Sequence, residues 1–187
     1  MSPILNNSQN KFLVDKTATV AFMGGSITEM EGYRPLVCEK LQTLFSETHF
    51  TFINAGISST TSTTGAFRFE HDILAKGPID LLFVEFAVND DQDGDHTREE
   101  CIRGMEGIIR HAWRCNPNMD IVVTYFINEA MLATLQKGEA PARIKAHQTV
   151  VDHYRLPVVN LAQEVARALA AGTLTWEQYG GVHPGPV

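Results

Sequence analysis

Apolar runs rich in β-branched and aromatic residues recur along the chain and predict β-strands. Four of them span residues 18–23, 50–53, 81–88 and 121–127, and a shorter fifth spans 157–161. The third reads LLFVEFAV and is almost continuously apolar instead of alternating, which is typical of a strand covered on both faces. The runs therefore predict a parallel sheet of about five strands.

Segments with helix signals lie between these runs, at residues 33–45, 97–114, 141–153 and 161–171. Pro35 lies near the start of the first, the sequence TREE opens the second as a capping box would, and Gly172 ends the last. Strands that alternate with helices predict an α/β fold, here a three-layer α/β/α sandwich of the flavodoxin-like kind.

Small and polar residues follow three of the predicted strands. The first strand ends in GGS at 24–26, the second in NAG at 54–56 and the third in VND at 88–90. The carboxyl ends of parallel strands meet at one edge of a sheet, and ligands bind beyond that edge. We therefore expect these three turns to form a site together.

The residue types in these turns suit acyl transfer. The glycines before Ser26 allow a sharp turn that presents both the serine hydroxyl and its N–H, although a serine that only caps a helix would look the same. Gly56 permits close backbone approach and offers a second N–H. The amide of Asn89 can donate to a developing oxyanion, where one donor is worth about 2.7–4 kcal/mol of barrier. His183 in GGVHP supplies a base that titrates near neutral pH.

These four motifs, in this order, resemble those of the SGNH/GDSL hydrolase family. GGSIT matches the serine motif, NAGISS the glycine motif, AVND the asparagine motif and VHP the histidine motif, over residues 19–183. The resemblance implies a serine esterase with Ser26 as nucleophile and His183 as base. It also implies an oxyanion hole formed by Ser26, Gly56 and Asn89, an acyl-enzyme intermediate, and no metal or organic cofactor.

The sequences of the segments GGSIT, NAGI, GAFRFE and VEFAVND are most similar to those of family members that deacylate carbohydrates. We therefore expect a small-molecule or carbohydrate ester as substrate, with acetyl groups preferred. Other members of the family hydrolyse lipid, aryl and thioester substrates, so a lipase or thioesterase remains the alternative.

The chain departs from the family pattern in two places. The aspartate usually found three residues before the histidine is replaced by Gly180, so the ring of His183 needs another partner. The backbone carbonyl of Gly180 and the carboxylate of Glu177 are the candidates, and we favour the carbonyl because it needs less ordering of the chain. The usual closing helix is also missing before Val187, which would expose part of one sheet face and favour a homo-oligomer.

A rival interpretation is a non-catalytic calcium-binding module. Residues 89–100 read NDDQDGDHTREE and fit an EF-hand loop at every constrained position except the first, where Asn replaces Asp. Such a loop follows a helix, however, whereas residues 81–88 predict a buried strand, and its eighth position, here His96, is normally apolar. We expect a solvated acidic loop instead.

Composition excludes several function classes. The 22 acidic residues outnumber the 15 Lys and Arg and give a net charge of -7 without a basic block, so no nucleic-acid partner is expected. The sequence shows no secretory signal and no membrane span, which favours a single cytoplasmic domain over residues 1–187. Cys38, Cys101 and Cys115 have no CxxC spacing and are expected to be reduced core residues.

Other polar residues have plainer interpretations. Four histidines lie in helix-like segments without the paired spacing of metal ligands: His71, His111, His147 and His153. Phe67 and Arg68 could line an acyl or sugar pocket, but a structural role in the helix after the glycine turn is the simpler expectation.

Overall fold

The computed structural model describes residues 5–185 and contains one five-stranded parallel sheet. The strand order is β2-β1-β3-β4-β5, and each neighbouring pair is parallel. The strands are β1 (Thr17–Gly24), β2 (His49–Gly56), β3 (Leu81–Glu85), β4 (Asp120–Tyr125) and β5 (Val158–Asn160). The predicted sheet and its parallel pairing are confirmed.

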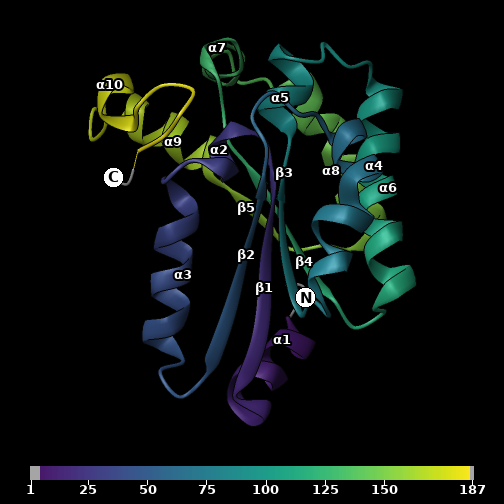
Figure 1. Cartoon of the computed structure of the whole chain (residues 1–187). Helices are drawn as coiled ribbons and strands as arrows, with labels where there is room; N and C mark the ends of the chain where they lie inside the picture. The colour runs from purple at the N-terminus through teal and green to yellow at the C-terminus, as the bar shows by residue number, and fades with distance from the viewer. Residues whose placement is uncertain (1–4, 186–187) are drawn as a thin grey trace.

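Helices cover both faces of the sheet. Figure 1 shows α3 (Tyr33–Leu44) on one side and α4 (Ser62–Asp72), α6 (Arg98–Cys115) and α8 (Ala142–Tyr154) on the other. The remaining helical segments are α1 (Asn6–Asn10), a π-helical turn (Lys11–Asp15), α2 (Ser26–Glu29), a 3₁₀ turn (Leu74–Lys76), α5 (Ala87–Gln92), α7 (Glu129–Gln136), α9 (Leu161–Ala170) and α10 (Trp176–Tyr179). The predicted α/β/α layering is confirmed.

The core is unequal on the two sides of the sheet. The larger apolar cluster includes Phe69, Phe86 and Met105 and fills the space under α4, α6 and α8. The smaller one centres on Phe22 and Leu81 beneath α3, a helix with no fully buried residue. The side with α4, α6 and α8 therefore contributes most of the apolar burial that stabilises the sheet.

The third strand is shorter than its sequence predicts. It ends at Glu85, and the last residues of the apolar run lie in α5, so Asn89 stands on a short helix and not at a strand end. An apolar run cannot by itself distinguish a buried strand from a buried helix. Two polar residues flank the end of the strand, Glu85 at its last position and Asp90 in α5, and their contacts are described below.

One helix and one group of residues differ from what the sequence pattern predicts. Helix α4, which lies outside the predicted helical segments, begins at Ser62, with the Thr61 side chain accepting from the N–H of Thr64. The three cysteines are free, as expected, but only Cys101 is buried, and Cys115 is exposed, so they are not all core residues.

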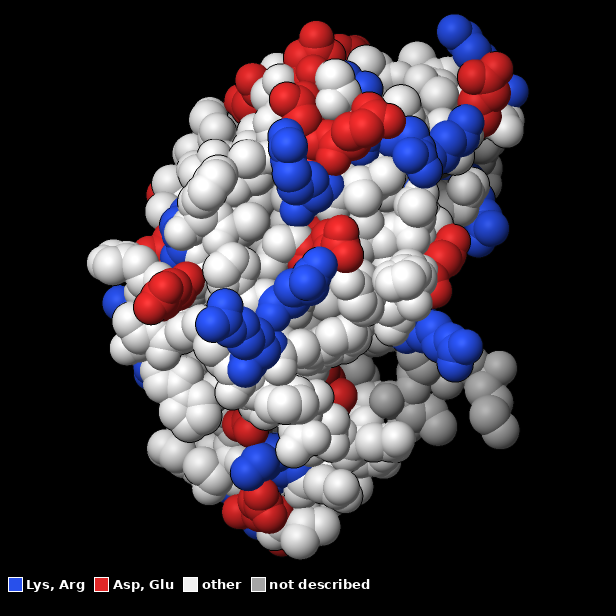
Figure 2. All heavy atoms as spheres, turned by 90° about the vertical axis from the view of Figure 1, so that its right-hand side faces the viewer, with Lys and Arg blue, Asp and Glu red and all other residues white. Residues whose placement is uncertain are grey.

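Surface charge is uneven on the face that carries α6. Figure 2 shows acidic side chains gathered at the end of the molecule where α5 lies, with basic ones interspersed with acidic ones below. This acidic end is also the end at which the strands terminate (Figure 1). Within residues 5–185, no helix is both long and apolar enough to cross a membrane.

Candidate active site

Ser26 and His183 meet although 157 residues separate them in the sequence. The distance from Ser26 Oγ to His183 Nε2 is 3.0 Å. Ser26 is the first residue of α2, directly after β1, and His183 lies in the loop that follows α10. A serine hydroxyl within hydrogen-bond distance of an imidazole nitrogen is the arrangement of a nucleophile and its general base.

The two glycines before Ser26 are required by crowding. A Cβ on Gly24 would lie 2.2 Å from Oε1 of Glu85, and a Cβ on Gly25 would lie 2.2 Å from Oδ1 of Asn89. Neither position can hold a side chain while these neighbours stay in place. The sequence pattern indicated a sharp turn here, and the structure adds that β3 and α5 press directly against it.

The three predicted oxyanion donors surround α2. Asn89 is buried against Gly25, and one of its amide N–H groups donates to Asp93 Oδ2 at 2.9 Å. Gly56 lies so close to the backbone of α2 that a Cβ there would be 2.2 Å from the Glu29 nitrogen. The N–H of Ser26 stands at the first position of the helix, where a backbone N–H has no acceptor within the helix.

The N–H of Gly56 already has an acceptor. It donates to the side-chain oxygen of Asn54 at 3.0 Å, while the Asn54 amide nitrogen donates to the Glu29 carbonyl at 3.1 Å. Asn54 therefore ties the end of β2 to α2. The Gly56 N–H can reach a ligand only if the Asn54 side chain turns away.

The segment before His183 is a tight turn. Gly180 ends α10 with φ of +91°, and a Cβ there would lie 2.8 Å from the His183 carbonyl oxygen. Among residues 5–185 the only hydrogen bond of the His183 ring is the one to Ser26. Neither the Gly180 carbonyl nor Glu177 is bonded to that ring, so the partner of Nδ1 stays a prediction.

A buried polar cluster that the sequence did not indicate lies behind Asn89. Asp90 is fully buried and accepts from the Ser62 N–H at 2.8 Å, the Ser62 hydroxyl at 2.7 Å and His147 Nε2 at 2.7 Å. Burial alone would raise the pKa of Asp90, but the hydrogen bond and charge of His147 and the hydrogen bonds of Ser62 outweigh it, so the pKa is lowered. The cluster joins α4, α5 and α8, and thereby fixes the helix that carries Asn89.

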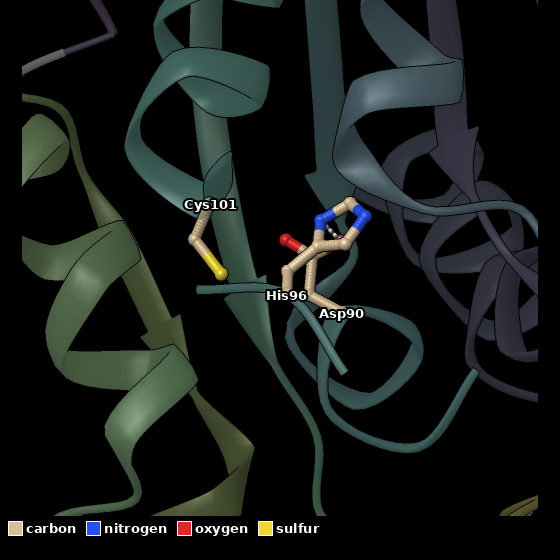
Figure 3. Close-up of side chains that lie close together, drawn as sticks. All are labelled: Asp90, His96 and Cys101. Carbon is tan, nitrogen blue, oxygen red and sulfur yellow. Dashed lines mark ion pairs between the residues drawn. The ribbon is translucent and has the colours of Figure 1, made fainter. Parts of the chain in front are cut away.

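Asp90 also has two groups beside it that could share a metal ion. Figure 3 shows His96 and Cys101 turned toward the carboxylate, and one ligand atom from each residue lies within 4.8 Å of the others. The donor types would suit Zn²⁺. The oxygens of Asp90 already accept the hydrogen bonds of Ser62 and His147, however, and burial raises the pKa of Cys101 to about 12, which keeps a protonated thiol beside Asp90. The carboxylate of Asp90 therefore serves as a hydrogen-bond acceptor within the protein.

The structure does not support the calcium-module interpretation. The segment that would form the EF-hand loop begins inside α5 and ends in the first turn of α6, so it is not a loop that joins two helices. Its proposed ligands have other partners: Asn89 bonds Asp93, Asp91 accepts from Asn128, and Glu100 completes the capping box of α6 with Thr97. These side chains do not converge on one point.

Arg68 has the structural role that the sequence favoured. Its guanidinium donates to the Ala55 carbonyl at 2.7 Å, to the Gly24 carbonyl at 2.9 Å and to Asp72 at 2.8 Å. The ends of β1 and β2 are thus held together beside Ser26. Phe67, its neighbour on α4, is 86% exposed.

Comparison with known proteins identifies the family. A family profile described as the GDSL-like lipase/acylhydrolase family matches residues 22–187, and the chain belongs to this family. Its solved members among the structural neighbours are carboxylic ester hydrolases. The expected family and the expected class of carboxylic ester hydrolase are confirmed.

Solved structures with the same fold include several esterases. A two-domain esterase active on acetylated mannans is 28% identical, with a TM-score of 0.77, and the match covers 97% of this chain but 47% of that one. A lipase/acylhydrolase from Enterococcus faecalis is 19% identical, with a TM-score of 0.63 and coverage of 90% and 87%. An acetyl xylan esterase is also 19% identical, with a TM-score of 0.66 and coverage of 83% of each chain. The chain thus spans about half the length of the two-domain esterase. No curated protein sequence matches it.

Proposed function

We propose that this chain is a serine esterase that hydrolyses short acyl esters through an acyl-enzyme. The observation that carries the proposal is the 3.0 Å contact between Ser26 Oγ and His183 Nε2 at the carboxyl edge of the sheet. The two residues come from opposite ends of the chain, and they are the nucleophile and base that the family pattern assigns. Family membership supports the reaction class.

The proposed mechanism has two stages. His183 Nε2 takes the proton of Ser26 Oγ as the hydroxyl oxygen attacks the ester carbonyl, and the protonated ring then gives that proton to the leaving alcohol. Water next attacks the acyl-enzyme with His183 again as base, which releases the acid and restores Ser26. These steps use only side chains and backbone groups of the chain and water.

The oxyanion would be held by groups on either side of Ser26. The Ser26 N–H points out of the first turn of α2, and the second amide N–H of Asn89 remains available because Asp93 accepts only the first. Gly56 would join as a third donor once the Asn54 side chain turns away from it. The hydrogen bond to Asp93 fixes the orientation of the Asn89 amide, because a carboxylate can accept from the amide nitrogen but not from the amide oxygen.

We further propose acetyl groups on carbohydrates as the substrate. The two-domain esterase that is 28% identical acts on acetylated mannans, and this relative gives the most direct support. A small acyl group suits a site that is open at the protein surface, where Ser26 is half-buried and His183 is exposed. The alternative from the same reaction class is a lipase or thioesterase.

Covalent labelling tests the assignment of the nucleophile. A fluorophosphonate reagent phosphonylates activated serines, so we expect one adduct per chain, located on Ser26 by peptide mass spectrometry. Labelling should slow when p-nitrophenyl acetate competes for the site, and it should slow strongly in His183→Ala. Ester hydrolysis by a chain that carries no adduct on Ser26 would contradict the proposal.

Acyl-chain length tests the substrate. We expect kcat/KM for p-nitrophenyl acetate to exceed that for the octanoate ester by roughly tenfold or more, since even one methylene that a site cannot accommodate changes the rate by about that factor. Steady-state rates with acetate, butyrate and octanoate esters give the comparison. A preference for octanoate would instead favour the lipase or thioesterase alternative.

A further inference from the structure

Glu85 is a fully buried carboxyl group directly beneath the nucleophile. It is the last residue of β3, it is 1% exposed, and it pairs with Gly24 in the sheet register. It forms no ion pair with any described residue, unlike Asp90. Burying an isolated charge is costly, so such a group calls for a role that offsets the cost.

One oxygen of Glu85 holds both sides of the Ser26 turn. Oε1 accepts from the Gly25 N–H at 3.0 Å and from the Thr28 hydroxyl at 2.8 Å. These donors lie one residue before and two residues after Ser26. The missing side chain of Gly24 leaves the space that this oxygen occupies, since a Cβ there would lie 2.2 Å from it. The carboxyl group therefore replaces the side chain that the turn cannot have.

The other oxygen has no partner. Oε2 of Glu85 is buried and accepts no hydrogen bond from residues 5–185. An unpaired buried oxygen costs much more free energy when it shares the negative charge of a carboxylate than when it belongs to a neutral carboxyl group. The geometry thus favours the neutral acid.

No cationic side chain of the described residues bonds the Glu85 carboxyl group; Arg34 and Arg68 lie nearby but donate to the carbonyls of Thr28 and Gly24 instead. Thr28 of α2, Tyr33 of α3 and Tyr179 of α10 are neutral, and Asp90 of α5 is negative. Burial raises the pKa of Glu85 to about 8, the contacts from Thr28 and Gly25 oppose that rise, and Asp90 adds to it. At neutral pH most molecules therefore carry a protonated Glu85.

We propose that Glu85 is a positioning residue that acts in its neutral form, holding the turn from Gly25 to Thr28 so that Ser26 stays aligned with His183. The inference rests on the proposed function of Ser26. Ionisation of Glu85 would place a negative charge with one unpaired oxygen beneath the nucleophile. That charge opposes the oxyanion formed above it and drives the turn to open toward water, so ester hydrolysis falls as Glu85 ionises.

The pH profile of hydrolysis tests this role. We expect kcat for p-nitrophenyl acetate to fall above an apparent pKa near 8, so that about a tenth of the plateau rate remains one pH unit higher. Glu85→Gln keeps the acceptor oxygen but cannot ionise, so it should keep most of the activity at pH 7 and lose the alkaline fall. The matched control is Glu29→Gln, which removes an exposed carboxylate that lies on α2 with Ser26 and is bonded to Ser58, and it should leave the fall unchanged.

Loss of the acceptor gives the second variant. Glu85→Met leaves the Gly25 N–H unpaired and the Thr28 hydroxyl with Tyr33 as its one remaining partner among the described residues. We expect kcat to drop by about 10²-fold with little change in KM, because the nucleophile is misplaced while the binding surface is kept. If Glu85→Gln keeps the kcat that Glu85→Met loses, the loss comes from the missing hydrogen-bond acceptor and not from a change in packing. An alkaline fall that persists in Glu85→Gln overturns the inference, even if Glu85→Met does not fold.

Two measurements do not depend on activity. The infrared band of a protonated carboxyl group should be present in the resting protein at pH 7 and absent in Glu85→Gln. Because the pKa of Glu85 is raised from 4.5 to about 8 in the folded protein, Glu85 contributes stability below pH 4.5 that is lost as the pH rises toward 8. The Tm of Glu85→Gln relative to that of the parent should therefore increase between these two pH values. If Ser26 is labelled but these signals are missing, only the inference fails; if Ser26 is not labelled, the proposed function fails.

Discussion

Replacement of Ser26 by alanine is expected to reduce hydrolysis of p-nitrophenyl acetate to the rate of the buffer, a loss of at least roughly 10³-fold. The variant removes the attacking oxygen but keeps the backbone N–H of the oxyanion site. The fold should persist because the Ser26 hydroxyl is bonded only to His183 among the described residues. Circular dichroism and the Tm check that the sheet is intact.

The same experiment includes two comparisons. His183→Ala should lose activity to a similar extent, and the double variant should be no worse than either, because the two groups act as a unit. Ser46→Ala, in the turn between α3 and β2 at the far end of the strands, is the control and should be as active as the parent. Full activity in Ser26→Ala would remove the basis of the assignment.

Replacement of Asp90 by alanine is expected to cause the largest loss of stability, about 3–5 kcal/mol. It would leave His147 and the Ser62 N–H buried without their partner, at a point where α4, α5 and α8 meet. Urea unfolding followed by fluorescence measures the change. Asp15→Ala breaks an exposed pair with Lys11 and should cost less than about 1 kcal/mol.

The effect of Asp90 should also depend on pH. Because its pKa is lowered in the folded protein, its contribution is present above the unfolded value of 3.8 and disappears as the pH falls through the lower folded value. The difference between the parent and Asp90→Ala should therefore narrow in acid. If Asp90→Ala and Asp15→Ala lose the same free energy of unfolding at neutral pH, the buried cluster stabilises the fold no more than an exposed ion pair does.

The sheet and the Ser26 and His183 pair could be predicted from the sequence because each rests on a local pattern. Buried parallel strands leave continuous apolar runs, and parallel strands bring their carboxyl ends to one edge. The end of β3 could not be predicted in this way. Phe86, Ala87 and Val88 are as apolar as the strand before them, whereas the contacts of Asp90 in α5, with Ser62 and His147, are long-range and leave no local pattern.

The supporting polar groups escaped sequence analysis for a different reason. His147 lies in α8 with no spacing that marks it, and its partner is 57 residues away. Glu85 leaves one signal, a single charged residue inside an apolar run, and that signal alone does not indicate a role at the site. The hydrogen bond from the Gly56 N–H to Asn54 depends on the rotamer of the Asn54 side chain, which no sequence pattern specifies.

Gly180 constrains how a triad acid could be introduced into this chain. The backbone there is left-handed, with φ of +91°, and the space where a side chain would begin is taken by the carbonyl oxygen of His183 itself. An aspartate codon at this position would not deliver a carboxylate to the imidazole, because the loop would have to be rebuilt before the side chain could fit. Mutational paths toward a faster enzyme therefore lead first through loop length and glycine content, or through an acid from a neighbouring element, and a designer should follow the same order.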